Sequence, residues 1–208
     1  MAGKRIILVE GPDDEHVIKA IFGQRNLPKL DEVKSHGGKD ALLEGFPVRL
    51  KESDVEALGV VIDADTDVSA CWQALRDRLM RAGYVGVPNA PLSHGTVLAA
   101  PRETLLPRVG VWVMPDNTTA GILEDFLRFL MPADSELFIH ANTSVISIPL
   151  DQKRFTDLQR PKALIHTWLA WQEEPGRPLG QSITARFLDH NVPQVDVFVQ
   201  WLRELFVF

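Results

Sequence analysis

The chain has 208 residues, of which 45% are hydrophobic, and its formal net charge is -6 at pH 7. This length is enough for one sizeable core, and the acidic balance argues against the global basic surface that drives non-specific nucleic-acid binding. The one cysteine, Cys71, excludes an internal disulfide and a cysteine-rich zinc site. With no secretory signal and no apolar run approaching about 18 residues, we expect a cytoplasmic protein with no membrane partner.

The first part of the chain alternates between strand and helix patterns. An apolar run at Arg5–Val9 predicts a strand, and apolar residues at helical spacing then predict a helix that begins at Asp13. A weaker strand at Glu32–Ser35 is followed by the turn HGGK, residues 36–39, and by a short helix at about residues 40–44. Two such strand–helix units predict a parallel sheet.

Two stronger strands continue this pattern. Ala57–Ile62 predicts a buried strand, and a helix is expected to begin near Ser69. Residues 84–108 are rich in Pro and Gly and predict a loop that holds one short strand at Thr96–Ala100. A continuous apolar strand follows at Val109–Met114. In a parallel sheet of this kind, ligands bind at the carboxyl ends of the strands.

Helical patterns dominate the remainder of the chain. Apolar residues at helical spacing predict helices within residues 123–130, 164–169 and 198–205. The segment EEPGRPLGQS, residues 173–182, predicts a turn-rich connector. We therefore expect an α/β domain over residues 1–150 and a helical extension over residues 151–208, packed on it as one structural unit.

Acidic residues follow three of the predicted strands. Glu10 comes directly after the first strand, and Asp116 comes after the strand that ends at Met114. The run VVIDADTD places Asp63, Asp65 and Asp67 at every second position after the third strand. Carboxylates this close repel one another unless a cation or a proton neutralises them. Because oxygen ligands suit hard cations, the sequence predicts a Mg²⁺ or Mn²⁺ site at this edge of the sheet.

Several of these acids have a structural explanation as well. Glu10 can serve as a turn acid before Gly-Pro. Asp13 and Asp14 are expected to be first-turn helix acids, with contact to the metal region as the alternative. Capping of the next helix is the favoured role for Asp67. Turn chemistry explains Asp116 as well as catalysis does. We therefore treat Asp67 and Asp116 as additional candidates beside the main acids.

The turn HGGK supplies the best basic candidate. Its two glycines free the backbone to approach a ligand, and Lys39 can meet a phosphate oxygen as a point charge. The spacing GxxxxGK[ST] is absent, so the turn is not a P-loop. Cys71 has no histidine beside it in sequence, and no GxSxG motif occurs, so hydrolysis of the serine or cysteine type has little support.

The segments VEGPDDEH and DAD, each at the end of a predicted strand, resemble the TOPRIM domain of topoisomerases, primases and overcoming-lysogenization-defect (OLD) nucleases. In that family the DxD acids hold Mg²⁺, and the glutamate is a general acid or base or a further metal ligand. The resemblance covers roughly residues 5–130. It implies that Glu10 takes the glutamate position and that Asp63 and Asp65 take the DxD positions.

A second segment, GILEDF at residues 121–126, is similar to the Leu-Glu segment that OLD nucleases use for a second metal, which nominates Glu124. The alternative for Glu124 is an ordinary exposed ion pair with Arg128, four residues on. Over nearly its full length the chain resembles small uncharacterised bacterial TOPRIM-related proteins, in which WVMPDNTTAGILEDF and a tail like EEPGRPLGQSIT recur. It lacks the ATPase domain of OLD proteins and the zinc-binding and helicase-contact modules of primases, so DNA synthesis and strand passage are not expected.

The fold predicted is therefore α/β, a TOPRIM-like doubly wound, mainly parallel sheet with a C-terminal helical extension. The leading prediction for function is divalent-metal-dependent phosphodiester hydrolysis of nucleic acid, DNA before RNA, with a separate ATPase as one candidate partner. Alternatives are a non-catalytic metal-binding nucleic-acid or regulatory module, and a phosphohydrolase or phosphotransferase acting on a small nucleotide. The predicted catalytic residues are Glu10 and Lys39, and the predicted metal ligands are Asp63, Asp65, Glu10 and Glu124.

Overall fold

A five-stranded sheet forms the centre of the protein, whose computed structural model describes residues 3–132 and 134–208. The strands are β1 (Lys4–Val9), β2 (Glu32–Ser35), β3 (Val55–Asp63), β4 (Thr96–Leu98) and β5 (Arg108–Met114). Their order across the sheet is β2-β1-β3-β5-β4. All neighbours are parallel except β4, which runs antiparallel to β5 at one edge. The predicted α/β fold with a mainly parallel sheet is confirmed.

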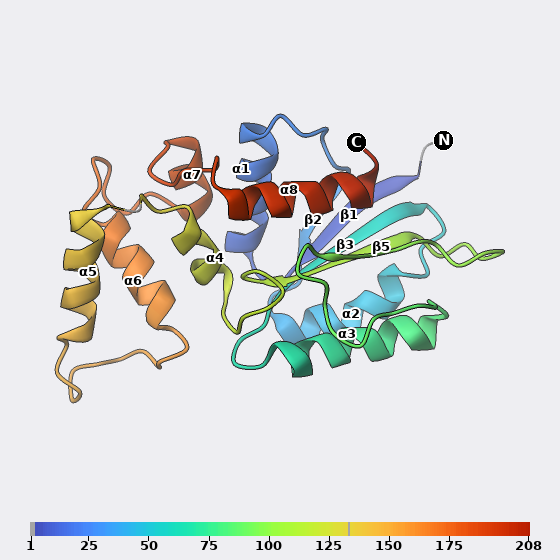
Figure 1. The fold of residues 1–208 in the computed structure, drawn as a ribbon, viewed down its shortest axis with the longest axis horizontal. Coiled ribbons are helices and arrows are strands. Elements are labelled where there is room, and N and C mark those ends of the chain that lie inside the picture. The colour runs from blue at the N-terminus through green and yellow to red at the C-terminus, as the bar shows by residue number, and fades with distance from the viewer. Residues whose placement is uncertain (1–2, 133) are drawn as a thin grey trace.

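Helices cover both faces of this sheet, as Figure 1 shows. Helices α1 (Pro12–Gln24) and α8 (Pro193–Phe206) pack on one face, against side chains such as Ile7 and Trp112. Helices α2 (Lys39–Arg49) and α3 (Val68–Ala82) pack on the other, against side chains such as Leu8 and Val60. Because the central strands are buried on both sides, their sequences are continuous apolar runs and not alternating ones.

Helix α2 is longer than the sequence indicates and continues through Pro47. Proline has no N–H, so the carbonyl of Leu43, four residues earlier, loses its partner within the helix. Arg78 of α3 replaces that partner, because its Nε donates to the Leu43 oxygen at 2.8 Å. Phe46 is fully buried in the core beneath α3. Packing and this one hydrogen bond therefore carry the helix past a residue that would otherwise end it.

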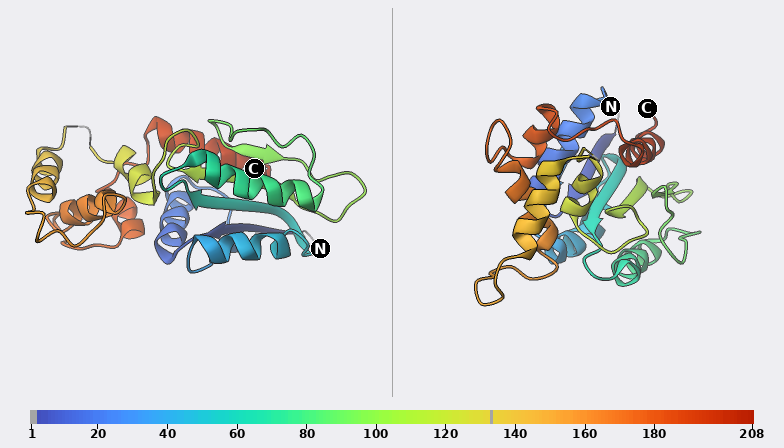
Figure 2. Two further views of the ribbon diagram at one scale, coloured as in Figure 1. Left: turned by 90° about the horizontal axis from the view of Figure 1, so that it is seen from below. Right: turned by 60° about the vertical axis from the view of Figure 1, so that its left-hand side comes forward.

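A second group of helices lies beyond the carboxyl ends of the strands (Figures 1 and 2). They are α4 (Leu123–Phe129), α5 (Glu136–Ile146), α6 (Arg160–Leu169) and α7 (Leu179–Thr184). Helix α5 has no counterpart in the prediction, and α7 occupies the second part of the segment predicted to be a turn-rich connector. None of the helices in the described ranges is both long and apolar enough to cross a membrane.

Helix α7 packs against α1 at very short range through Gly180. A Cβ atom added to Gly180 would lie 2.6 Å from the backbone oxygen of His16, which cannot move without shifting α1. We expect Gly180→Ala to lower the free energy of unfolding by about 1 to 3 kcal/mol. Gly23→Ala is the matched control, because a Cβ there meets nothing within 4 Å, and it should be neutral or slightly stabilising. Thermal unfolding followed by circular dichroism measures both, and equal melting temperatures would contradict this contact.

Candidate metal centre

Four segments bring carboxyl groups to the carboxyl edge of the sheet. Glu10 follows β1, Asp63 is the last residue of the neighbouring strand β3, and Asp14 lies in the first turn of α1. Glu124 lies in the first turn of α4. The backbone N–H of Asp65 donates to the carbonyl of Gly121 at 2.9 Å, which ties the DAD loop to the segment that leads into α4. Parallel strand pairing and this one backbone hydrogen bond thus bring together acids that are far apart in the sequence.

Glu10 is held by the backbone of the adjacent strand end. Its Oε1 accepts a hydrogen bond from the N–H of Asp63 at 2.7 Å. Burial raises the pKa of Glu10 to about 7, against the opposing effects of this hydrogen bond and of the positive charge on Lys39. The negative charges of Asp14 and Asp65 raise the pKa further. A carboxyl group with a pKa near neutrality is suited to exchanging a proton at physiological pH.

Asp63 occupies the least favourable position for a negative charge. Its Oδ1 is buried and, among the described residues, has no hydrogen-bond partner. Burial raises the pKa of Asp63 to about 9, and the nearby charges of Glu10, Asp14 and Glu124 act in the same direction. An ionised carboxylate here needs a cation, because a buried charge without a partner is strongly destabilising. Without a cation, Asp63 therefore holds a proton at neutral pH.

Lys39 reaches the DAD loop from the first residue of α2. Its Nζ donates to the backbone oxygen of Asp63 at 2.7 Å and to Oδ2 of Asp65 at 2.6 Å. The preceding glycines, Gly37 and Gly38, have φ angles of 77° and 131°, which other residues rarely adopt. The N–H of Gly38 donates to the backbone oxygen of Glu10 at 2.8 Å, so it serves the strand end instead of a ligand. The HGGK turn thereby places one positive charge beside the carboxyl groups.

Asp14 and Glu124 are buried members of the same cluster, with exposed fractions of 7% and 5%. Burial raises the pKa of Asp14 to about 6, although its Oδ2 accepts the N–H of Gly11 at 3.0 Å. Glu124 does not form the exposed ion pair with Arg128 that its spacing suggested; its Oε1 lies 3.5 Å from Nζ of Lys162 on α6. The structure therefore does not contain the alternative ion pair, because α4 turns Glu124 inward.

Asp14 was not among the predicted site residues. The sequence signal was present, since Asp14 lies four residues after the strand-end acid Glu10, a spacing that brings the first helical turn back toward the strand end. Acidic residues are common in the first turn of a helix, however, because they interact favourably with the helix dipole. This role alone accounts for Asp14 in the sequence, without a functional site. Only its burial next to Glu124 distinguishes it from an ordinary capping acid.

The two additional candidates have local structural roles. Oδ1 of Asp67 accepts the N–H of Ala70 at 2.9 Å and caps α3, as the sequence indicated. Oδ1 of Asp116 accepts hydrogen bonds from the backbone N–H and the hydroxyl groups of Thr118 and Thr119. These contacts account for both carboxylates without a ligand, so neither is needed to explain the cluster.

The donor chemistry of this edge fits a hard divalent cation. Within residues 3–132 and 134–208, no three Asp, Glu, His or Cys side chains stand in a ready-made coordination arrangement. Mg²⁺ commonly takes only one or two carboxylates from the protein and keeps several waters. Oδ1 of Asp63 is buried without a hydrogen-bond partner among the described residues, so it is available to a cation. The carboxylate of Glu10 is fixed beside it by the N–H of Asp63. Asp65 is less available, because its Oδ2 is engaged by Lys39.

The fold and this edge define an α/β protein with a cluster of carboxyl groups at the carboxyl ends of a mainly parallel sheet. The chain belongs to the family described as Protein of unknown function (DUF3226), whose model matches residues 4–207. Searches of curated proteins and of solved structures gave no significant match. The family match spans both the sheet with its acids and the helical end of the molecule.

Proposed function

We propose that this protein is a cytoplasmic, divalent-metal-dependent phosphodiesterase with a TOPRIM-like domain, which hydrolyses nucleic acid, DNA in preference to RNA. The observation that carries the proposal is the buried, unpartnered oxygen of Asp63 in the middle of converging carboxyl groups. A purely structural role would favour apolar residues or paired charges at such a position. Clusters of perturbed carboxyl groups at the carboxyl edge of a sheet are typical of functional sites.

The carboxylates divide into two sets that would hold Mg²⁺ or Mn²⁺. Asp63, Asp65 and Glu10, whose charges influence one another, would hold one cation at the ends of β1 and β3. Asp14 and Glu124, which are coupled in the same way, would hold a second. A bound divalent cation supplies Lewis-acid stabilisation of phosphate oxygens and lowers the pKa of bound water. Cations would also offset the net charge of -6, which otherwise repels a polyanion.

The side chains of the protein provide proton transfer and charge. Glu10, with a pKa of about 7, would accept the proton of the attacking water as the new P–O bond forms and the bond to the sugar oxygen breaks. The N–H of Asp63 fixes Oε1 of Glu10 and so orients the carboxylate. Lys39 would bind a non-bridging phosphate oxygen with the one N–H that its two present acceptors leave free.

A second candidate function is hydrolysis of a small nucleotide. The acidic net charge of the chain favours it, because a small anion needs no extended basic surface. The two candidates share the acidic cluster and differ in substrate length. A separate ATPase is a candidate partner in the first case, since the chain has no nucleoside-triphosphate P-loop of its own.

The test is a cleavage time course in Mn²⁺ on end-labelled single- and double-stranded DNA and RNA, run beside a mononucleotide substrate. We expect the wild type to cut a polymer and Glu10→Gln to cut it about 10²- to 10⁴-fold more slowly, the usual contribution of a general base. Glu15→Gln is the control, because Glu15 lies in the same helix as Asp14 but forms an ion pair with Lys19 instead of joining the clustered acids. Equal rates for wild type and Glu10→Gln would refute the proposal, and turnover of the mononucleotide alone would establish the second candidate.

A further inference from the structure

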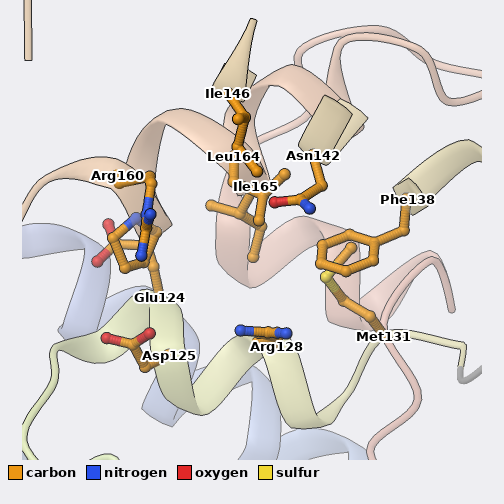
Figure 3. Close-up of a pocket in the computed structure, with 11 residues that line it drawn as sticks. Glu124, Asp125, Arg128, Met131, Phe138, Asn142, Ile146, Arg160, Leu164 and Ile165 are labelled. Atoms are coloured by element: carbon orange, nitrogen blue, oxygen red, sulfur yellow. The ribbon is translucent and has the colours of Figure 1, made fainter. Parts of the chain in front are cut away.

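A pocket beside the acidic cluster lies between α4, α5 and α6. Its volume is about 210 Å³, larger than the roughly 150 Å³ cavity that accommodates benzene in an engineered protein. Glu124 belongs both to the wall of this pocket and to the group of acids that raise the pKa of Asp63. The pocket therefore adjoins the site at which hydrolysis is proposed. Figure 3 shows Glu124 and Asp125 among the residues that line the pocket.

Two arginines line this pocket, and neither forms a salt bridge among the described residues. Among the described residues, neither Arg128 nor Arg160 has a side-chain nitrogen within 4.0 Å of a carboxylate oxygen. Both are close enough to Asp125 to oppose the rise in its pKa that burial causes. Oδ2 of Asp125 is itself engaged, because it accepts the N–H of Ile122 at 3.0 Å. Two guanidinium groups at one pocket, neither of them in a salt bridge within the described part of the chain, can bind a phosphate between them.

The remaining wall is mainly apolar and contains one amide side chain. Leu164 and Ile165 of α6 face Phe138 of α5 across the pocket, and Asn142 of α5 points toward its interior (Figure 3). Cζ of Arg128 lies 5.7 Å from the centre of the Phe138 ring, so the guanidinium group makes a cation–π contact with one face of this ring. A nucleobase stacks on such rings, and an amide matches the donors and acceptors along its edge.

We propose that this pocket binds one nucleoside monophosphate unit of the substrate, next to the phosphodiester bond that is hydrolysed. Arg128 and Arg160 bind its phosphate, Phe138 stacks on its base, and Asn142 contacts the edge of the base. The inference rests on the proposed function, because it takes the neighbouring acids to be the hydrolytic site. It adds the chemical class of the group that is recognised and the residues that recognise it.

The pocket can be tested without any catalysis. Titration calorimetry in EDTA would measure binding of 2′-deoxyadenosine 5′-monophosphate, inorganic phosphate and deoxyadenosine to the full chain. We expect the nucleotide to bind at least about 10-fold more tightly than either part alone, since both the stacking and the charged contacts contribute. Arg128→Gln and Arg160→Gln should each weaken the nucleotide at least about 5-fold, and Phe138→Leu should weaken it while leaving phosphate unchanged. Arg102→Gln, in the loop between β4 and β5, is the control and should bind as the wild type does.

Binding of oligonucleotides distinguishes whether the nucleotide unit comes from a nucleic-acid strand or from a free nucleotide. If a strand supplies it, the same arginine variants should also weaken binding of a short single-stranded DNA; if only free nucleotides enter, DNA binding should not change. Nucleotide binding equal in wild type and in both arginine variants would overturn the pocket assignment, whether or not the protein cuts DNA. If the wild type binds the nucleotide but cuts no substrate, and the arginine variants lose this binding, the pocket assignment is supported and the nuclease proposal is rejected.

Discussion

Asp63→Asn should raise the melting temperature of the metal-free protein and abolish its stabilisation by Mn²⁺. The pKa of Asp63 is raised to about 9, so at pH 7 folding forces this group to take up a proton that the unfolded chain has released. Asparagine has the same shape and avoids that cost, because it cannot ionise. We expect a gain of about 2 kcal/mol, equivalent to roughly 4 to 8 °C in a chain of this size. A residue whose removal stabilises the empty protein is one that is retained for function.

Mn²⁺ should raise the melting temperature of the wild type. A ligand that binds only the folded state at 100 times its dissociation constant stabilises by about 2.7 kcal/mol. This shift should vanish in Asp63→Asn, whose amide is a far weaker ligand for a hard cation. Asp67→Asn is the matched control, since Asp67 lies in the same loop, caps α3, and asparagine caps equally well. A normal Mn²⁺ shift in Asp63→Asn would remove this residue from the metal site.

Raising the pH from 6 to 9 in EDTA should lower the melting temperature of the wild type. Asp63, Glu10 and Asp14 have pKa values raised to about 9, 7 and 6, whereas in the unfolded chain they ionise near pH 4. Between those limits the folded state holds protons that the unfolded state has released, so stability falls as the pH rises. The stabilisation is fully present below about pH 4 and is lost above about pH 9. Each proton that only the folded state holds lowers the free energy of unfolding by about 1.4 kcal/mol per pH unit. This corresponds to a fall of roughly 3 to 6 °C in melting temperature per pH unit.

Mn²⁺ should reduce or reverse this slope, because cations bind the deprotonated carboxylates and release the protons. Calorimetric titrations of Mn²⁺ in two buffers with different ionisation enthalpies count those protons directly. At pH 7 we expect release of at least about one proton per protein molecule, since Asp63 is protonated there in the empty protein. Asp63→Asn should show a flatter dependence of melting temperature on pH in EDTA. A melting temperature that rises with pH in EDTA would mean that these pKa values are not raised.

The sheet and its edge could be predicted because their signals are local. Each strand is a short apolar run, and Glu10, Asp63 and Asp65 stand directly at the strand ends, where parallel pairing must gather them. The role of Lys39 as a positive charge near the site could be predicted from the turn before it. The partner it contacts, Asp65, could not, because no local pattern links residues 26 positions apart.

The parts that the sequence did not indicate depend on packing between distant segments. Glu124 has a suitable ion-pair partner four residues on, yet its actual partner, Lys162, comes with α6. Helix α5 was missed because apolar residues such as Ile139 and Ile146 remain exposed and blur the helical pattern. Helix α7 begins in a segment rich in Pro and Gly and is held by the close approach of Gly180 to α1. Patterns along the chain do not record such contacts.

The hydrogen bond from Arg78 to the carbonyl of Leu43 also bears on how the protein folds. Pro47 leaves the last turns of α2 without one internal bond, so this helix is complete only when α3 lies beside it. The two helices should therefore open and close together as one cooperative unit in native-state hydrogen exchange. Lys39 begins α2, so the positive charge beside the carboxyl groups reaches its place only as that pair of helices assembles.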